Sequence, residues 1–175
     1  MKNLILILSV LISLLFSSCV SKKIAYTSSI QKEYQFSEEK LKKIQFYTSG
    51  KIVLVKANQD GEAKISDGML LMINKNDIET VIIPRNTKCI VEQVLDDNRF
   101  LFSFEVGDGK FILFGNNGGE GCYSLMSKEW AGGVGTIQYA NKNYVTQDGN
   151  VFLLIEAKKL NKLKAKERLV KGRTI

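Results

Sequence analysis

The side chains that could carry out acid-base chemistry in this chain are carboxylates, because the sequence contains no histidine. The lack of histidine excludes Ser-His-Asp and Cys-His nucleophiles and nearly all catalytic zinc sites. The acids with suggestive neighbours are Asp96 with Asp97, and Glu120 with Asn116 and Asn117. Two converging carboxylates could hydrolyse a glycan, and the second group offers oxygen ligands for calcium. Acids in loops are usually solvated and no spacing here resembles a calcium loop, so the sequence predicts no catalytic residue, metal site or cofactor.

The glycine-rich stretches do not indicate a nucleotide site. The sequence contains no Gly-x-Ser-x-Gly elbow and no phosphate-binding loop of the Gly-x-x-x-x-Gly-Lys-Ser/Thr type. Residues 115–121 and 132–135 are rich in glycine, but neither leads from a strand into a helix as a nucleotide loop must. Trp130, the single tryptophan, could stack on a sugar, although a buried loop anchor is the commoner role of a lone tryptophan.

The N-terminal residues have the composition of a secretion signal. Met1-Lys2-Asn3 is a short basic start, and Leu4 to Phe16 is a thirteen-residue stretch with only apolar residues and two serines. A membrane-spanning helix needs about 20 apolar residues, so this stretch is too short to remain as a span. We predict a signal peptide at residues 1–18.

The end of this segment resembles the lipobox of bacterial lipoproteins, in which small residues precede a cysteine. Phe16-Ser17-Ser18-Cys19 carries the resemblance, with Phe16 where the motif most often has leucine. The resemblance implies that Cys19 is diacylated on sulfur, becomes the new N-terminus after cleavage and is usually acylated again on nitrogen. The alternative is an ordinary signal peptide cleaved near Ser18, with Cys19 left as a thiol.

A lipidated Cys19 would make the membrane a partner of the protein. Each buried methylene contributes about 0.8 kcal/mol, and two or more acyl chains give a stable anchor. Val20-Ser21-Lys22-Lys23 has neither the acidic cluster that resembles a surface-export signal nor the aspartate after cysteine that resembles an inner-membrane retention signal. We therefore expect an outer-membrane lipoprotein that faces the periplasm.

The net charge of +7 is concentrated at the C-terminal end of the chain. Residues 158–173 hold eight basic side chains and one acid, whereas residues 19–157 hold sixteen basic and seventeen acidic side chains. The basic balance therefore gives no argument that the domain binds nucleic acid. Clustered lysines gain about 1 kcal/mol each near an anionic membrane, so the tail could contact anionic lipid or an acidic envelope polymer; a solvated extension is the alternative. The lysines concerned are Lys158, Lys159, Lys162, Lys164 and Lys166.

The chain after the signal is long enough for one domain. We assign residues 19–36 to the lipidated N-terminus and a tether, because they are polar and show no convincing period. Residues 37–157 form the predicted β domain, which begins with a short helix over residues 37–44 capped by Ser37. Residues 158–175 are predicted to form a basic C-terminal helix or tail.

Most of the domain shows the period of two that is typical of strands. Phe100, Phe102 and Phe104 fall on one face of a strand, with Ser103 on the other. Four Asp-Gly pairs supply the positive backbone angles of tight hairpins. We predict a mainly β fold, a single antiparallel barrel or sandwich. The other predicted strands are 51–56, 78–84, 89–95, 110–114, 135–139 and 151–155, and the Asp-Gly pairs are Asp60-Gly61, Asp67-Gly68, Asp108-Gly109 and Asp148-Gly149.

Two cysteines remain after Cys19, namely Cys89 and Cys122. A disulfide between them would stabilise the fold by roughly 3–4 kcal/mol. Both stand in apolar, strand-like segments, where a cysteine is commonly a small buried hydrophobe. We favour two free thiols, with the disulfide as the alternative.

Residues 45–156 are similar, in a diffuse way, to small all-β lipoproteins of unassigned function from the Bacteroidetes. The segments that carry this resemblance are 44–49, 51–54, 102–105 and 111–114. It implies the architecture and the envelope setting, and no active-site residues. We predict a membrane-anchored, non-enzymatic binding or structural module whose partner is an envelope protein or polymer. The alternative is a carboxylate-dependent hydrolase of envelope glycans.

Overall fold

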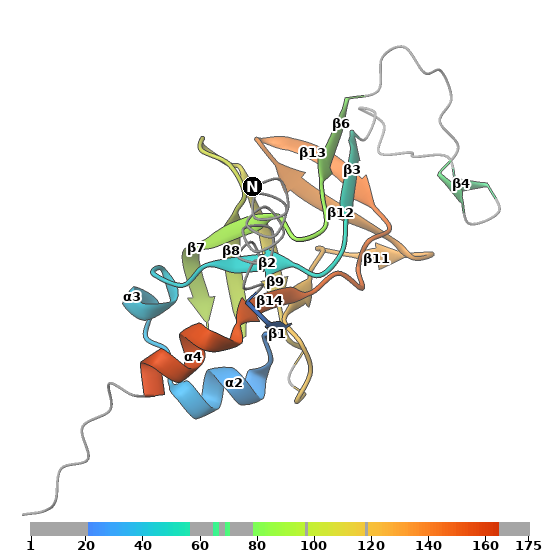
Figure 1. Ribbon diagram of the computed structural model, residues 1–175. Coiled ribbons are helices and arrows are strands. Elements are labelled where there is room, and N and C mark those ends of the chain that lie inside the picture. Colours follow the sequence, from blue (N-terminus) through green and yellow to red (C-terminus); the bar gives the residue numbers. More distant parts are fainter. Residues whose placement is uncertain are drawn as a thin grey trace, which may run out of the picture.

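The computed structural model describes residues 21–56, 65–66, 69–70, 79–96, 98–117 and 119–164. Its strands form a seven-stranded sheet, a five-stranded sheet and a separate two-stranded ladder. Figure 1 shows the five-stranded sheet at the upper right and the helices at the lower left, at the opposite end of the seven-stranded sheet. The predicted mainly β, antiparallel fold is confirmed: the two large sheets form a sandwich-like arrangement and do not close into a barrel.

All the pairings between the described strands are antiparallel. The seven-stranded sheet contains, in spatial order, β1 (Lys23–Ala25), β14 (Leu153–Glu156), β2 (Phe46–Thr48), β7 (Lys88–Asp96), β8 (Arg99–Ser103), β9 (Phe111–Gly115) and β10 (Ser124–Leu125). The five-stranded sheet contains β11 (Trp130–Ala131), β12 (Val134–Tyr139), β13 (Lys142–Thr146), β3 (Ile52–Lys56) and β6 (Thr80–Ile83). The two-stranded ladder pairs β4 (Ile65–Ser66) with β5 (Met69–Leu70).

Aromatic rings fill the middle of the main core. Phe100 and Phe102 alternate along β8 and have no exposed surface, as their spacing predicts, and Phe104 packs against the same core beyond the end of the strand. The ring of Phe46 on β2 meets that of Phe102 edge to face, at a centroid distance of 5.1 Å. Burial of each such side chain contributes about 1.5–3 kcal/mol, so these rings hold the strands in register.

The predicted tether over residues 19–36 is wrong for its described part. Residues 23–25 form edge strand β1, and the helix α2 (Ser28–Tyr34) follows. Between them Tyr26 has no exposed surface, and its backbone N–H donates to Leu153 O at 2.8 Å. A three-residue edge strand is too short to show a period, which is why the sequence did not reveal it. The described residues from Lys22 onward are therefore part of the folded unit.

Two short helices follow β1. Thr27 caps α2, because its hydroxyl accepts the Ile30 N–H at 3.3 Å. The helix predicted over residues 37–44 is present as the single turn α3 (Glu38–Leu41). Ser37 precedes it but makes no side-chain capping bond. An ion pair of 2.8 Å joins Lys42 to Glu38 instead.

The basic C-terminal segment begins as a helix that is packed onto the domain. Helix α4 (Ala157–Lys164) continues from β14, and the Ala157 N–H donates to Lys22 O at 3.0 Å. Leu160 is only 4% exposed and belongs to the main core. Lys162 and Lys164 lie on α4, but their side chains lie outside the described part, as does Lys166. Among the helices that the structure describes, none is long and apolar enough to span a membrane.

Hairpin turns account for part of the Asp-Gly pattern. Gly109 has φ +69° in the turn between β8 and β9, as an Asp-Gly turn requires. The two-residue hairpin between β12 and β13 instead turns at Ala140 and Asn141, with φ of 48° and 60°. Asp148 accepts the Val53 N–H at 2.7 Å. Asp60-Gly61 and Asp67-Gly68 lie outside the described residues.

Cys89 and Cys122 are free thiols in the structure. Cys89 lies on β7, where burial raises the pKa of its thiol well above the usual range. Cys122 lies opposite Thr27, beyond β1. Strands β2 and β14 lie between β7 and β1 in the sheet order. The two cysteines are therefore on separate parts of the seven-stranded sheet.

The substitution Tyr26→Ala tests whether this N-terminal segment is part of the fold. Because Tyr26 is fully buried and stacks on Tyr123 at 4.8 Å, its loss should lower the free energy of unfolding by about 3–5 kcal/mol, measured by urea denaturation. Ser29→Ala, at an exposed position of α2, is the control. A loss no larger than that of the control would mean that the segment is a tether.

Candidate functional site

The most complete candidate site is a cleft of about 350 Å³ where the two large sheets meet. Its sides are the outer faces of β8 and β9 in one sheet and of β12 and β13 in the other. Because β9 and β12 belong to different sheets, no ladder joins them. This volume lies at the lower end of the range for small-molecule sites, about 300–1,000 Å³.

The two walls of the cleft differ in chemistry. One wall is apolar, and its side chains come from β8, β9 and the segment after β10: Leu101, Phe111, Leu113 and Met126. The other wall is polar and uncharged, and its side chains come from β12, β13 and the turn between them: Thr136, Gln138, Asn141 and Asn143. Lys128 is the charged residue of the lining. None of the described lining residues is an acid or a thiol.

Hydrogen bonds bound the cleft at both ends: at one end a bond joins its two sides directly, and at the other end the segment 126–129 crosses from β9 to β12. At one end the Ala140 N–H donates to Gly109 O at 2.8 Å, which docks the β8–β9 turn on the β12–β13 turn. A Cβ at Gly109 would lie 2.9 Å from Asn141 Oδ1, so the close approach also needs glycine there. At the other end, Met126 N–H donates to Leu113 O at 2.9 Å and Thr136 N–H to Glu129 O at 3.4 Å.

A polar cluster around the carboxylate of Glu105 lies beside the end of the cleft where the β8–β9 and β12–β13 turns meet. Glu105 accepts a hydrogen bond from the Tyr139 hydroxyl at 2.7 Å and pairs with Lys110 at 3.2 Å. The tyrosine hydrogen bond, and then Lys110, hold the pKa of Glu105 below its usual value. Burial, with Glu105 as a second cause, raises the pKa of Tyr139. The cluster ties the β8–β9 loop to β12 with an ionised carboxylate and a neutral phenol.

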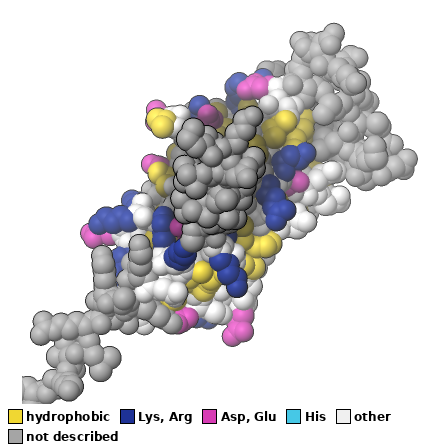
Figure 2. Space-filling view, viewed as in Figure 1, with side chains coloured by type: hydrophobic (Ala, Val, Ile, Leu, Met, Phe, Trp, Pro, Cys, Tyr) yellow, Lys and Arg dark blue, Asp and Glu magenta, His cyan; other side chains and the backbone are white. Residues whose placement is uncertain are grey.

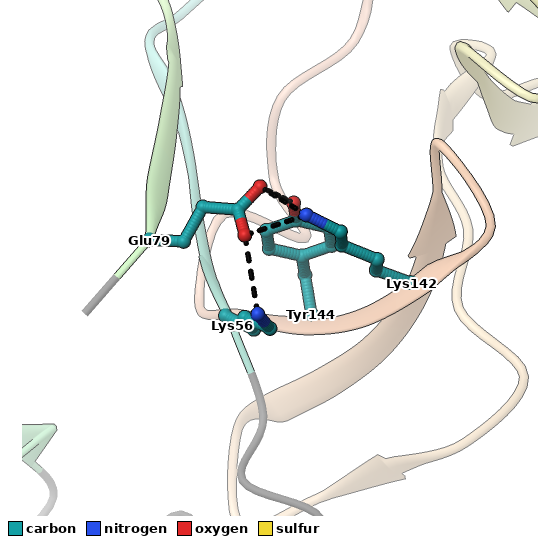
Figure 3. A network of polar contacts seen from close by, with 4 residues as sticks. All are labelled: Lys56, Glu79, Lys142 and Tyr144. Atoms are coloured by element: carbon teal, nitrogen blue, oxygen red, sulfur yellow. Dashed lines mark hydrogen bonds and ion pairs between the residues drawn. The ribbon is translucent and has the colours of Figure 1, made fainter. Parts of the chain in front are cut away.

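A second cluster joins β3, β6 and β13 (Figure 3). The carboxylate of Glu79 accepts hydrogen bonds from Lys142 at 2.7 Å and from the Tyr144 hydroxyl at 2.9 Å, and it pairs with Lys56 at 3.2 Å. Lys142, Tyr144 and Lys56 together lower the pKa of Glu79 to about 2. Because the Lys56 N–H also donates to Glu79 O at 3.0 Å, the cluster fixes the end of β3 beside the start of β6.

A third cluster lies where β1 meets β14 and β2. The Tyr47 hydroxyl donates to Glu156 at 2.5 Å, and the Lys23 ammonium lies 3.7 Å from the centre of the Tyr47 ring. Burial, and then Glu156, raise the pKa of Tyr47 to about 12. The Tyr47 hydrogen bond lowers the pKa of Glu156, and the charge of Lys159 lowers it further. Lys159, one of the lysines of the predicted basic contact, therefore lies close to this cluster, and Lys158 is exposed beside it.

The acidic and amide residues that the sequence analysis singled out lie in turns and loops. Asp96 accepts the Asn98 N–H at 3.0 Å and pairs with Arg99 at 2.6 Å in the β7–β8 turn; Asp97 lies outside the described residues. Asn116 donates to Gly121 O at 2.6 Å and accepts the Gly119 N–H at 3.1 Å, so its amide shapes the loop. Glu120 and Asn117 are exposed there. Within the described ranges, no group of three or more acidic or cysteine side chains is placed to hold a metal ion.

The ring of Trp130 packs against two glycines. A Cβ at Gly135 or Gly149 would lie within 2.9 Å of the Trp130 ring, so the ring lies flat on the backbone of both. The side chain is 40% exposed and is not part of the lining of the cleft. The sequence analysis favoured a buried loop anchor, whereas Trp130 is exposed and lies on the edge strand β11.

The electrostatics of the described acids bear on the hydrolase alternative. A second hollow of about 450 Å³, over β7 and the β8–β9 loop, contains Glu92, Glu105 and Asp108. The general acid of a glycosidase needs a raised pKa. Among the described carboxyl groups whose pKa is displaced, all are lowered: Glu79, Asp96, Glu105 and Glu156. These four groups are therefore suited to hold charge and not to donate a proton near neutral pH.

No residue of the cleft was identified as a site residue from the sequence. The cleft is assembled from positions 101 to 143, which come together only when the two sheets meet. The alternation that buries Phe100 and Phe102 places Leu101 on the outer face of β8, but a single outward leucine is common and does not by itself indicate a site. Leu113 is its cross-strand partner on β9.

The Glu79 cluster should make stability depend on pH. The pKa of Glu79 falls from 4.5 to about 2 on folding, so its contribution is present above pH 4.5 and is lost as the pH falls toward 2. Glu79→Gln should therefore lower the free energy of unfolding at neutral pH, with a smaller difference from the wild type at about pH 3. The control is Glu39→Gln, at an exposed position of α3. An equal loss at both pH values would contradict the electrostatic role.

Comparisons with protein-family models, with curated protein sequences and with solved structures find no match to this chain. The resemblance to the lipobox and to small all-β lipoproteins therefore stays a prediction. The function has to be inferred from the residues themselves, and chiefly from the cleft and from the end of the sheet where β1 pairs with β14.

Proposed function

We propose that this chain is a lipid-anchored protein of the bacterial cell envelope that acts as a non-enzymatic binding module. The anchor is Cys19, and the membrane is the outer membrane, with the domain facing the periplasm. The observation that carries the proposal is the position of β1, which begins four residues after Cys19. The lipobox-like sequence supports the lipidation, and the cleft, whose described lining contains no acid, supports a binding role.

The short connection limits how far the domain can stand from the bilayer. Four residues of extended chain span at most about 14 Å. Lys23 pairs with Glu156 across the β1–β14 ladder, and Lys22 accepts the Ala157 N–H at 3.0 Å. A lipidated Cys19 would therefore hold the start of α4 within roughly this distance of the headgroups.

The lysines at this end of the sheet would then face the membrane surface. We call Lys22, Lys23, Lys158 and Lys159 the basic pole; they flank the junction of β1 and α4. Figure 2 shows lysine and arginine side chains among hydrophobic ones on the face displayed. Each lysine near an anionic bilayer gains about 1 kcal/mol. Lys162 and Lys164 on α4, and Lys166 beyond it, would extend the same contact.

A hydrolase that acts on envelope glycans is the weaker candidate. The cleft between the two large sheets has no acid in its described lining. The second hollow contains Glu105, but Tyr139 and Lys110 lower the pKa of that group. A binding role agrees better with a cleft of amide, hydroxyl and apolar side chains.

Substitution of the anchor residue tests the first part of the proposal. In a bacterial host that lipidates its exported proteins, Cys19→Ser should move the protein from the membrane fraction to the soluble periplasmic fraction. Mass spectrometry of the wild-type mature N-terminus should find an acylated Cys19. Cys122→Ser, at a half-buried cysteine of the domain, is the control and should stay with the membrane. An unmodified Cys19, or a Cys19→Ser protein that stays in the membrane fraction after a high-salt wash that screens the lysine contacts, would refute the anchor.

The basic pole can be tested apart from the lipid. The probe is the unlipidated chain of residues 19–175 with Cys19→Ser, since every residue of the described main core lies between 24 and 160. Co-sedimentation with phosphatidylglycerol vesicles should weaken about fivefold for each of Lys22→Gln and Lys158→Gln. Lys40→Gln and Lys51→Gln, at exposed positions of α3 and before β3, are the controls. Binding that is unchanged by the first two substitutions would exclude the pole.

A further inference from the structure

Backbone N–H and C=O groups that take part in no β-ladder face the cleft between β9 and β12, together with side chains. Leu113 O accepts the Met126 N–H, so the backbone of Leu113 points toward this edge of β9. Residues two apart in a strand point their backbone groups to the same edge, so the N–H and C=O of Phe111 also point there. On β12 the Thr136 N–H donates to Glu129 O, and by the same rule the backbone groups of Gln138 face the cleft.

This arrangement gives paired donors and acceptors on the polar side. Gln138 and Asn143 are cross-strand partners, and their exposed side chains lie next to each other on one face of β12 and β13. Each amide side chain has both donor and acceptor atoms. Thr136, two residues before Gln138, adds a hydroxyl about 7 Å along the strand. A ligand with many hydroxyl groups, each of which donates and accepts, matches such a wall better than one with a single type of polar group.

The apolar wall requires the ligand to have a nonpolar face as well. Leu101 and Leu113 are cross-strand partners, and Phe111 and Met126 lie beside them, all half-buried. These side chains form an apolar surface about two strands wide, and neighbouring strands lie close to 5 Å apart. A flat ring with C–H groups on its face and hydroxyl groups at its edge would contact both walls at once.

The closed ends limit the length of the occupant. The hydrogen bonds at Gly109 and at Leu113 stand four residues apart on the chain, which corresponds to about 13 Å of strand. An extended peptide that adds a strand would have to run past both closures. A compact ligand of one or two rings would fit between them without breaking either.

We propose that the cleft between β9 and β12 binds a short, uncharged carbohydrate, one or two sugar rings long, with Gln138 and Asn143 as the main polar contacts. The proposal rests on the binding role given above and names its ligand class. The sugar ring packs its C–H face on Leu101, Leu113 and Phe111 and directs its hydroxyl groups to the amide wall. The lack of an acid in the described lining means that the sugar is held and not cleaved.

The test uses NMR chemical-shift mapping on the unlipidated chain of residues 19–175 with Cys19→Ser. The probes are maltose, cellobiose and N,N′-diacetylchitobiose at millimolar concentration, with trialanine as the peptide probe. At least one sugar should shift the backbone amides of Phe111, Gln138 and Asn143. Gln138→Ala and Asn143→Ala should each weaken that sugar about three- to tenfold, the range for one hydrogen bond. Thr80→Ala, at an exposed position of β6 outside the cleft lining, should leave the affinity unchanged.

Three results would overturn this inference. The first is a lack of shifts at the cleft amides with all three sugars. The second is a set of shifts that the Gln138 and Asn143 substitutions do not weaken. The third is a response at the cleft to trialanine alone, which would assign the site to peptides. The lipid anchor is measured separately on Cys19, so a negative sugar result with an acylated Cys19 would refute the ligand class and leave the anchored module in place.

Discussion

The pairing of β1 with β14 joins the start of the described chain to its end. It places Lys23 opposite Glu156, and the Ala157 N–H on Lys22 O extends the ladder by one more bond. Tyr26, next along the chain, is fully buried against Phe46 and Tyr123. This contact turns a segment with the composition of a linker into the edge of the sheet. The basic helix α4 and the proposed anchor at Cys19 are consequently neighbours in space, although they are far apart in sequence.

Three glutamates of the domain make the same kind of structural contact. Glu79, Glu105 and Glu156 each accept a hydrogen bond from a tyrosine hydroxyl, and a lysine lies near each. Each cluster ties together strands or loops that are distant in sequence, and exposed pairs of this kind contribute modestly to stability. None of these three glutamates lines the cleft, in which Lys128 is the charged residue. The proposed role of the domain as a binding module is based on that lining.

The sequence revealed the parts of the fold that have a local signal. Strands with clean alternation, such as β8 with Phe100 and Phe102, were predicted close to their observed bounds. Strands β1, β10 and β11 were not, since two or three residues show no period and pair only because the sheet is already there. The five-residue strand β13 (Lys142–Thr146) was missed as well. The β12–β13 turn was missed because Ala140-Asn141 lacks the Asp-Gly signature. The cleft could not be predicted, because Leu113 and Gln138 meet only through the packing of two sheets.

The account depends most directly on β1 being a strand of the folded domain and not a linker. Hydrogen–deuterium exchange of the mature lipidated protein in detergent micelles measures this at single amides. The account predicts that the amides of Tyr26 and Ala157, which donate to Leu153 O and Lys22 O, exchange as slowly as those of the central strand β8. Exchange of the Tyr26 amide at the rate of an unstructured peptide would contradict it, because the domain could then stand well away from the bilayer.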